Sequence, residues 1–508
     1  MKSKYKMIVI GAGISGLSTA LAWSKIYNAE DVLVLEKNSI PGGCVTTFAR
    51  KGYKFDTTQI IPDVSNLLTF FDIEIPLKKF ENYYARLFLA DTEKRQAGIY
   101  PIASSKTEFS DYLIKKFPED KKSIERFFDY CQAMYDELNY LKTEPKLKDI
   151  PGILLHCPKI INNSNKTYHQ FLHKFNFKNS EVFNILDTFS SFSGLSGNRC
   201  AALLTACAMI TTLKGSCRPE KGFIQFPLLL KNKLETLGTK VITRVKVEKI
   251  LVKNNRVTGV RLTDGVEINA DYVIATGDTK VTFNELLDKP QWPNIYFKKV
   301  DKVEMSPSGF SIQLGLDDEL NLEELGFNCG YNVLTTPGAH EKIFSAYEKN
   351  ELHISDDCFH LAAICPSLMT GGKQTMVIHV VPVPAEKWIK LRENNYEKYR
   401  IEKHKIAVFY IKKVTQYMIP GLEEHIQYID VSTPATYRRY IGSPTGSQYD
   451  MLPVPENFGK NRLKTRTPVK GLFVPKFSHG IWPCMQAGLQ VVDMISGGKI
   501  MNGNSSLR

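Results

Sequence analysis

The chain has 508 residues, of which 43% are hydrophobic and 23% are charged, which is the composition of an ordinary globular protein rather than a disordered one. This length suggests about two to three domains. The 66 Lys and Arg against 53 Asp and Glu give a net charge of +13, which would draw the surface toward anionic membranes or nucleic acid. Because the charge is spread along the chain and forms no basic block, it favours solubility instead.

The ten cysteines include no CxxC pair and no His-rich spacing suited to zinc, so we expect reduced, mostly buried thiols and no metal site. The first six residues run straight into a predicted strand and leave no room for a signal peptide, which predicts a cytoplasmic protein. No apolar window reaches the about 18 residues of a spanning helix. The longest candidate window, Ala201 to Leu213, suits a buried helix or a segment that enters only the membrane interface, so peripheral membrane contact stays open.

The start of the chain predicts a βαβ unit. Met7 to Ile10 and Val32 to Leu35 are short apolar runs typical of buried parallel strands. Between them Ile14, Leu17 and Leu21 recur at helical spacing. Strand, helix and strand within about 30 residues predict a parallel sheet.

The middle of the chain changes character twice. Pro76 to Leu213 is rich in Phe, Tyr, Lys and Asn and predicts a helical insertion. Leu234 to Ala275 contains short β-rich runs broken by Asn-Asn and Asp-Gly pairs, which predict a β-meander.

The C-terminal half predicts a second sheet and two helices. Ser306 to Leu316 and Gln374 to Val383 are expected strands, and Tyr396 to Met418 is an expected long helix with one apolar face. A buried strand at Gly471 to Val474 and a helix from about Met485 to Ile495 complete the chain.

A glycine motif joins the first predicted strand to the first predicted helix. Gly11, Gly13 and Gly16 form GxGxxG, in which the first glycine allows a tight turn, the second a close approach to pyrophosphate, and the third helix–strand packing. The N–H groups at the helix start, at Ile14 and Ser15, would face the phosphates. Strand, glycines, helix and strand in this order predict a dinucleotide site.

The end of the second strand carries the matching acid. Glu36, followed by Lys37, is placed to accept hydrogen bonds from ribose hydroxyls. Pro41, Gly42 and Gly43 follow within seven residues, and a glycine pair so close to the acid is more typical of FAD enzymes than of NAD dehydrogenases. FAD is therefore the expected nucleotide.

Several stretches are diagnostic when taken together: GAGISGL, EKNSIPGG, TTFARKGYKFDT, SPSGF, PGLEEHI, STPATYRRYIGSPTGSQYD and TPVKGLFV. From end to end, the chain resembles the phytoene desaturase, carotenoid isomerase and retinol saturase superfamily of FAD-dependent oxidoreductases. The resemblance implies an α/β fold with a discontinuous Rossmann-type FAD-binding domain at residues 1–75, 215–290 and 465–508. It also implies a mixed α+β substrate domain, with the helical insertion, at residues 76–214 and 291–464.

The function implied by the resemblance is desaturation, saturation or redox-assisted cis–trans isomerisation of a long apolar polyene or isoprenoid lipid, such as a carotenoid or retinoid. The flavin would exchange electrons with this lipid in an apolar, water-poor cavity. The three reactions are not separated at this level, and the electron acceptor is open.

The resemblance also implies further cofactor contacts. The main chain near Val247 would contact the adenine end of FAD, with Gly277 close by. The N-terminus of the helix after Pro483, at Met485, would face the flavin pyrimidine ring, and Gly488 would let that helix approach closely. Ordinary β-packing is the alternative for Val247 and Gly277.

The chain departs from the family pattern at three places. Asp56-Thr57-Thr58 replaces the usual Asp-Thr-Gly, and Lys221-Gly222 replaces a Gly-Gly pair. Pro475-Lys476 replaces the Gly-Asp whose acid touches the ribitol and phosphates of the cofactor. Losing that carboxylate would alter the hydrogen bonds to ribitol, although Lys476 could neutralise pyrophosphate charge.

No catalytic acid, base or nucleophile stands out. His479 and Cys484 lie beside the expected flavin face and are candidates for proton transfer, with structural packing as the alternative for each. Tyr437, Arg438 and Arg439 could hold a polar substrate end or a quinone, or be exposed loop residues.

Two other functions remain open. A flavin amine oxidase shares the fold but surrounds the flavin with an aromatic cage, and the four tryptophans do not cluster in the sequence, although Trp482 lies near the expected flavin face. A non-catalytic lipid carrier resembling the Rab GDP-dissociation inhibitors has this fold without flavin, and Pro475-Lys476 would suit it.

Overall fold

The computed structural model describes residues 2–57, 61–80, 82–141, 147–288, 295–328, 330–457, 462–475 and 480–501, without the side chains of 61 and 62. Three residues named above lie outside this part of the chain, namely Thr58, Lys476 and His479, as do one of the four tryptophans, Trp292, and one of the ten cysteines, Cys329.

The first sheet has a parallel centre and an antiparallel edge. Its strand order is β10-β2-β1-β13-β12-β11, and β19 pairs parallel with β13. The strands are β1 Lys4–Ile10, β2 Val32–Leu35, β10 Lys240–Ile242, β11 Val247–Lys253, β12 Arg256–Leu262, β13 Glu267–Ala275 and β19 Leu472–Phe473. The four strands β10, β2, β1 and β13 are parallel, as the alternation of strand and helix predicts.

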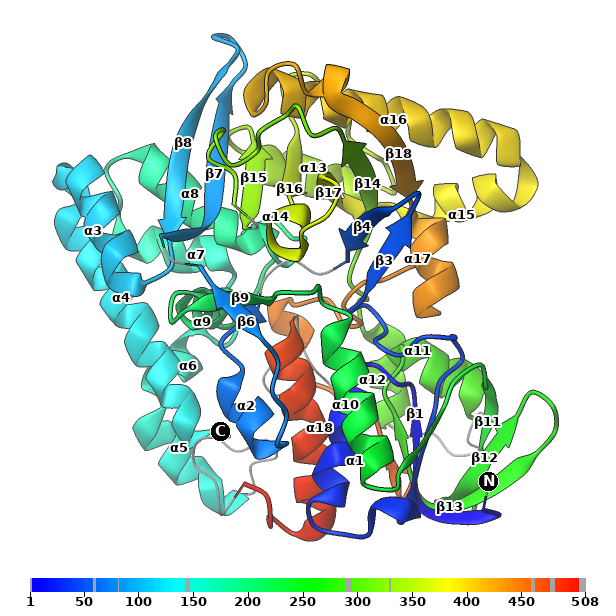
Figure 1. The fold of residues 1–508 in the computed structure, drawn as a ribbon. Coiled ribbons are helices and arrows are strands. Elements are labelled where there is room, and N and C mark those ends of the chain that lie inside the picture. The colour runs from blue at the N-terminus through cyan, green and yellow to red at the C-terminus, as the bar shows by residue number, and fades with distance from the viewer. Residues whose placement is uncertain are drawn as a thin grey trace.

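Three helices lie together beside this sheet: α1 Ile14–Ser24, α10 Gln225–Thr236 and α18 Ile481–Ser496 (Figure 1). Gly488 lets α18 pack closely on α1, because a Cβ there would lie 2.8 Å from both the Ser15 carbonyl oxygen and the Thr19 nitrogen. Apolar residues of all three helices form one buried cluster with β1 and β2.

The second sheet is antiparallel except at one junction. Its order is β18-β14-β17-β16-β15-β7-β8, with β15 and β7 parallel. The strands are β7 Tyr83–Asp91, β8 Gln96–Ala103, β14 Ser308–Leu316, β15 Tyr331–Thr335, β16 His360–Ile364, β17 Thr375–Val383 and β18 Ile426–Ser432. Alternate residues of β14 (Phe310, Ile312 and Leu314) pack in one apolar cluster with α15 Ala385–Asn394 and α16 Tyr396–Tyr417.

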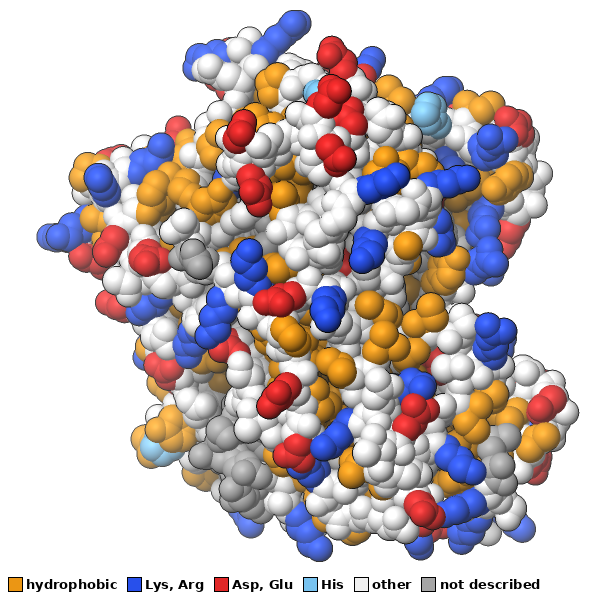
Figure 2. All heavy atoms as spheres, in the orientation of Figure 1, with side chains coloured by type: hydrophobic (Ala, Val, Ile, Leu, Met, Phe, Trp, Pro, Cys, Tyr) orange, Lys and Arg blue, Asp and Glu red, His pale blue; other side chains and the backbone are white. Residues whose placement is uncertain are grey.

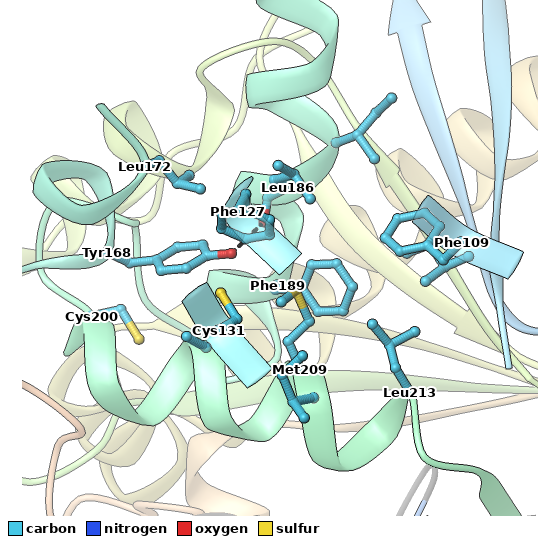
Figure 3. Packing of buried hydrophobic residues seen from close by; sticks show 14 of the residues in the cluster. Phe109, Phe127, Cys131, Tyr168, Leu172, Leu186, Phe189, Cys200, Met209 and Leu213 are labelled. Carbon is cyan, nitrogen blue, oxygen red and sulfur yellow. Dashed lines mark hydrogen bonds between the residues drawn. The ribbon is translucent and has the colours of Figure 1, made fainter. Parts of the chain in front are cut away.

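A helical layer supplies a separate core against the other face of the second sheet. Its helices are α3 Lys106–Lys116, α4 Lys121–Asp136, α5 Ile150–His156, α6 Pro158–Asn163, α7 Tyr168–Leu172, α8 Ser180–Ser191 and α9 Ala202–Thr212. Phe109, Phe127 and Phe189 point into this core (Figure 3). The Tyr168 hydroxyl within it donates to the Leu186 carbonyl at 3.2 Å, which satisfies its buried polar group.

Smaller elements connect these layers. They are the hairpin β3 Thr47–Arg50 and β4 Tyr53–Asp56, the small sheet β5 Ile61–Pro62, β9 Ser216–Pro219 and β6 Leu77–Lys79, and the helices α2 Ser65–Phe70, α11 Thr279–Val281, α12 Ile295–Lys302, α13 Ala339–Glu348, α14 Ser367–Thr370 and α17 Pro434–Ile441. Within the described part of the chain, no helix is both long and apolar enough to cross a membrane. None of the nine described cysteines forms a disulfide, and seven of them are buried, as expected.

Two predictions about the middle of the chain are wrong in part. The predicted helical insertion begins with strands β6, β7 and β8. The β7 pattern was hidden by a charged residue, Arg86, whose guanidinium lies 4.4 Å from the Phe327 ring and whose Nε donates to Asn332 at 3.0 Å. The predicted meander is limited to β11, β12 and β13, because Leu234 belongs to α10 and β10 pairs parallel with β2.

Two boundaries near the predicted site also differ. Helix α18 begins at Ile481, so Pro483 lies in its first turn, where a missing N–H is tolerated. Tyr437, Arg438 and Arg439 lie in helix α17 and not in a loop. Thr433 caps this helix with a capping box, and Pro434 occupies its first position.

Candidate functional site

The glycine motif forms the tight turn between β1 and α1. Gly11 has φ +103°, which favours glycine, and its N–H donates to the Leu35 carbonyl at 2.8 Å. A Cβ on Gly16 would lie 2.0 Å from the Gly11 carbonyl oxygen, so only glycine lets α1 start this close to the turn.

The N-terminus of α1 offers unfilled hydrogen-bonding capacity. Its N-cap, Gly13, supplies no side-chain cap, and the first turn holds no acidic residue. A Cβ on Gly13 would meet nothing within 4 Å, and the buried Ser15 hydroxyl has no hydrogen-bond partner among the described residues. Free N–H groups, the helix dipole and an unpartnered hydroxyl together suit a phosphate group.

Glu36 joins the end of β2 to the glycine turn. Its carboxylate is 5% exposed and accepts from the Ala12 N–H on one oxygen and the Asn38 N–H on the other, each at 2.8 Å. Each oxygen keeps a lone pair for a ribose hydroxyl. Lys37 is exposed and lies against Gly442, where a Cβ would be 2.4 Å from its Nζ.

The second glycine pair lies against the first motif. Gly42 and Gly43 have φ +128° and +62°, and the Gly42 N–H donates to the Ala12 carbonyl at 2.8 Å. A Cβ on Gly43 would lie 3.6 Å from the Gly13 Cα. The structure thus brings together the residues predicted to hold the pyrophosphate and ribose, and their geometry fits those groups of FAD.

The remaining predicted contacts are spread around this turn. Val247 is buried in β11 opposite Leu262, which leaves only its main chain for a ligand, whereas Gly277 is exposed with open space beside it. Met485 is fully buried in α18. The N-cap of α18, Gly480, has φ +102° and no side-chain cap, so this helix also begins with unfilled N–H groups.

Cys484 and Cys44 face a common region between α18 and the glycine-pair loop. The Cys44 thiol donates to the Gln448 carbonyl at 3.5 Å. Burial raises the pKa of the Cys484 thiol. Cys44 is an exposed residue, but protein atoms around its sulfur displace water, and this desolvation raises the pKa of its thiol to about 11. Both thiols therefore stay protonated near neutral pH, which argues against Cys484 as a base or nucleophile.

Helix α17 separates the three residues that the sequence grouped together. Arg438 pairs with exposed Glu393 at 2.9 Å, and Arg439 is exposed. Tyr437 turns inward, and its hydroxyl lies 2.6 Å from Ser311 Oγ. Of the three, only Tyr437 joins the interior.

The second sheet contributes residues that sequence reasoning missed. Ser311 Oγ lies 2.8 Å from His379 Nδ1, across the β14–β17 pair. A cavity next to this pair is lined by Ser191, Phe192, Gly194, Tyr331, His360, Ala362, His379, Val381 and Tyr449. A histidine at an alternating position of a predicted strand, His379 in Gln374 to Val383, was the available signal.

The changed Asp-Thr-Gly motif has a structural role. Asp56 and Arg218 form an ion pair at 2.8 Å with side chains only 2% and 1% exposed. Asp56 also accepts from the Phe223 N–H at 3.3 Å and from the Thr47 hydroxyl. Gly222, of the changed Gly-Gly pair, has φ +91° and packs against Thr47. Pro475, of the third departure, is buried.

Comparison with known proteins agrees with this geometry. The family model of flavin containing amine oxidoreductase matches residues 14–398. The chain is 23% identical to all-trans-retinol 13,14-reductase of Danio rerio over 98% of its own length and 86% of that protein, and 25% identical to chloroplastic prolycopene isomerase of Daucus carota over 92% and 76%. An oxidoreductase from Methanosarcina mazei has the same fold, with a TM-score of 0.64 at 17% identity over 97% of this chain and 100% of that one.

These findings confirm the predicted superfamily, the α/β fold with a Rossmann-type sheet, and FAD as the cofactor. The matched region contains Gly16 of the glycine motif, Glu36 and the second glycine pair. The chain therefore belongs to the flavin containing amine oxidoreductase family and is a FAD-dependent oxidoreductase.

Proposed function

We propose that this oxidoreductase acts on a long apolar polyene or isoprenoid lipid, such as a carotenoid or retinoid, by desaturation, saturation or redox-assisted isomerisation. The alignment with a retinol reductase and a prolycopene isomerase over nearly the whole chain carries the proposal, and a small cavity on the second sheet marks the place that we assign to the lipid. Phe192, Ala362 and Val381 give it apolar walls, and Tyr449, on its rim, is adjacent in sequence to Gln448, which binds Cys44 beside the glycine pair.

We propose that the chain forms two domains, each built from separate segments. Residues 1–75, 215–290 and 465–508 form the FAD-binding domain, because every strand of the first sheet comes from them. Residues 76–214 and 291–464 form the substrate domain, which supplies every strand of the second sheet.

The proposed cofactor contacts follow from the site geometry. The open N-terminus of α1 binds the pyrophosphate, Glu36 the ribose, and the N-terminus of α18 the flavin ring. The full set is Gly11, Gly13, Ile14, Ser15, Gly16, Glu36, Lys37, Gly42, Gly43, Val247, Gly277, Met485 and Gly488. FAD, when bound, supplies the two-electron chemistry, and the chain orients the lipid and excludes water.

The proposal is tested by purification followed by a visible spectrum and mass spectrometry of extracted lipids. We expect flavin absorbance and a co-purifying or added polyene that changes the flavin spectrum under anaerobic conditions. Peroxide release from amines instead would indicate an amine oxidase, although Trp23 and Trp388 are buried in two different cores and form no cage. Bound lipid without flavin would indicate a carrier.

We also propose that the protein reaches its lipid by resting on a membrane surface. Leucines in and before α5 are unusually exposed: Leu147 is 85%, Leu154 61% and Leu155 73% exposed. Figure 2 shows hydrophobic side chains gathered at the lower left, where Figure 1 places α5. Lys148 and Lys159 flank this patch, so apolar contact and charge both favour an anionic bilayer.

Vesicles of phosphatidylcholine with and without phosphatidylserine test this surface. We expect Leu154→Ser with Leu155→Ser to weaken sedimentation with vesicles by at least about tenfold, because each buried leucine contributes roughly 1.5–3 kcal/mol. Exposed Leu228 in α10 provides the control, Leu228→Ser. Equal binding of the double variant and the native chain would contradict the proposal.

A further inference from the structure

One face of the second sheet carries a row of polar residues across neighbouring strands. In the β-sheet pairing, Ser311 of β14 lies opposite His379 of β17. His379 in turn lies opposite Ala362 of β16, two residues after His360. Residues opposite each other or two apart share a face, so Ser311, His379 and His360 all project toward the helical layer. The other face of these strands is apolar.

Hydrogen bonds extend this row at its inner end. His379 Nδ1 lies 2.8 Å from Ser311 Oγ, and the same oxygen lies 2.6 Å from the Tyr437 hydroxyl. A hydroxyl can accept one hydrogen bond while it donates another, so the three groups form a continuous path. His360 and His379 both line the cavity that holds the proposed substrate.

The row continues outward through a second histidine pair. The rings of His360 and His340, of α13, lie 3.8 Å apart between centroids. Buried His360 Nδ1 and His340 Nε2 have no hydrogen-bond partner among the described residues. Buried polar atoms without a hydrogen-bond partner are uncommon in native proteins, and a functional role is one explanation for them.

The outer end is a second pocket that contains His340 together with His169, Asp187 and Glu341. His169 Nε2 lies 3.0 Å from the Asp187 carboxylate. Pro337, Gly338 and Glu341 on the pocket rim are exposed. The row therefore begins where solvent protons are available.

We propose that His340, His360 and His379, with the Ser311 and Tyr437 hydroxyls, form a proton path from this outer pocket to the substrate cavity. The path rests on the proposed function only for the identity of the lipid. His379 exchanges the proton with the substrate, and His340 and His360 relay the proton between His379 and the outer pocket. Ser311 and Tyr437 lie on the other side of His379, where their hydroxyls hold its ring through Nδ1 and are the positioning residues.

The protonation states suit such a path. Burial lowers the pKa of His340 and His379 to about 4, and burial with the neighbouring His340 and His379 holds the pKa of His360 well below its usual range, so all three are neutral near pH 7. Each neutral ring carries one donor and one acceptor nitrogen. Burial raises the pKa of Tyr331 and Tyr449, which face the cavity, so neither competes as an anion. At the outer end, burial alone would lower the pKa of His169, but Asp187 raises it overall.

The reaction needs this proton. Desaturation removes two hydrogens and forms a C=C bond: bound FAD would supply the acceptor for one hydrogen with both electrons, and the other would leave the adjacent carbon as a proton. His379 would accept that proton and pass it through His360 and His340 to the outer pocket. Saturation runs in the opposite sense, with His379 as donor.

Photoreduction of the FAD holoenzyme tests the path without any lipid, because reduced flavin takes up a proton and the proposal requires that proton to enter from the outer pocket through the empty substrate cavity. Flavin absorbance and the colour of a pH indicator are recorded together in weakly buffered solution. We expect His340→Ala and His379→Gln to slow proton uptake by at least about tenfold, the lower range of acid–base contributions. Imidazole should restore the rate of His340→Ala, whose outer pocket is open, but not that of His379→Gln. His404→Gln, at an exposed position of α16, is the control.

Wild-type uptake rates in both variants would overturn the proposal. Slowing of His340→Ala without rescue by imidazole would overturn it equally, because a merely structural role is not restored by a proton carrier. His340→Gln replaces His340→Ala if the latter does not fold. A wild-type protein that shows these effects but converts no polyene would leave the path standing and reject the proposed substrate.

Discussion

In both sheets side chains alternate between the two faces, but the two sheets place their polar residues differently. The central strands of the first sheet are apolar on both faces, since β2 is buried throughout and helices or loops cover it. Its polar chemistry lies at strand ends, in Gly11 and Glu36. The second sheet is apolar on one face, while Ser311 and His379 project from within its strands, and His360 from the start of β16, on the other. A cofactor site at strand ends is built from neighbouring residues and can be recognised as a motif in the sequence. A site on a sheet face is built from residues of different strands and leaves no such motif.

The histidines sharpen this contrast. All ten histidines follow residue 155, and none lies in a strand of the first sheet. Imidazole side chains, which can accept and donate a proton, therefore belong almost wholly to the second region.

The largest loss of stability is expected at the buried ion pair between Asp56 of β4 and Arg218 of β9. Arg218→Met leaves the buried Asp56 carboxylate without its cation, which should lower the free energy of unfolding by about 3–5 kcal/mol. Urea unfolding measures this loss. The double variant Asp56→Asn with Arg218→Met should recover much of it, and a double variant as unstable as the single one would contradict the ion-pair explanation.

A matched glycine pair separates folding from cofactor binding in the first region. Gly16→Ala puts a Cβ into the Gly11 carbonyl and should cost about 3 kcal/mol, with loss of FAD. Gly13→Ala meets nothing within 4 Å and should keep the thermal stability of the apoprotein while it weakens FAD retention. Flavin content and apoprotein melting temperature distinguish the two. Full FAD retention by Gly13→Ala would argue against pyrophosphate at this turn.

Acid should destabilise the second region through its neutral histidines. Burial depresses the pKa of folded His340 and His379 to about 4 from the ordinary histidine value of about 6.5, so the unfolded chain binds more protons between these values. The stabilisation is nearly complete at pH 7 and is lost as the pH falls through 6.5 toward 4, by roughly 1.5–2 kcal/mol per histidine between pH 7 and 5. Urea unfolding at pH 7 and 5 measures the loss. His340→Gln should reduce it, and an unchanged pH dependence would refute its assignment to this histidine.

The smallest effect is expected on the outer face of α17. Arg438→Ala removes an exposed pair with Glu393 and should change the free energy of unfolding by under about 1 kcal/mol, with normal flavin content. Tyr437→Phe, one residue earlier, removes the inward hydroxyl and should alter proton uptake during photoreduction instead. A large loss of FAD in Arg438→Ala would contradict this prediction and indicate that Arg438 contributes to the cofactor site.

Local signals account for the correct predictions. Val32 to Leu35 matches β2, and Tyr396 to Met418 matches α16 within one residue, because uninterrupted apolar runs and helical spacing depend only on neighbours in the sequence. Strand β7 was missed because buried Arg86 is stabilised by Phe327 and Asn332, more than 200 residues away. Arg218 and His379 were missed for the same reason, since each partner lies on a distant strand.

By itself the sequence determined the nucleotide-binding turn, the parallel strands around it and the class of cofactor, because glycine conformation and strand alternation are properties of short segments. The tertiary structure decided which polar residues meet beyond that turn. Ser311, His379 and Tyr437 come from β14, β17 and α17, and only pairing across the second sheet and the packing of α17 on it bring them within hydrogen-bonding distance.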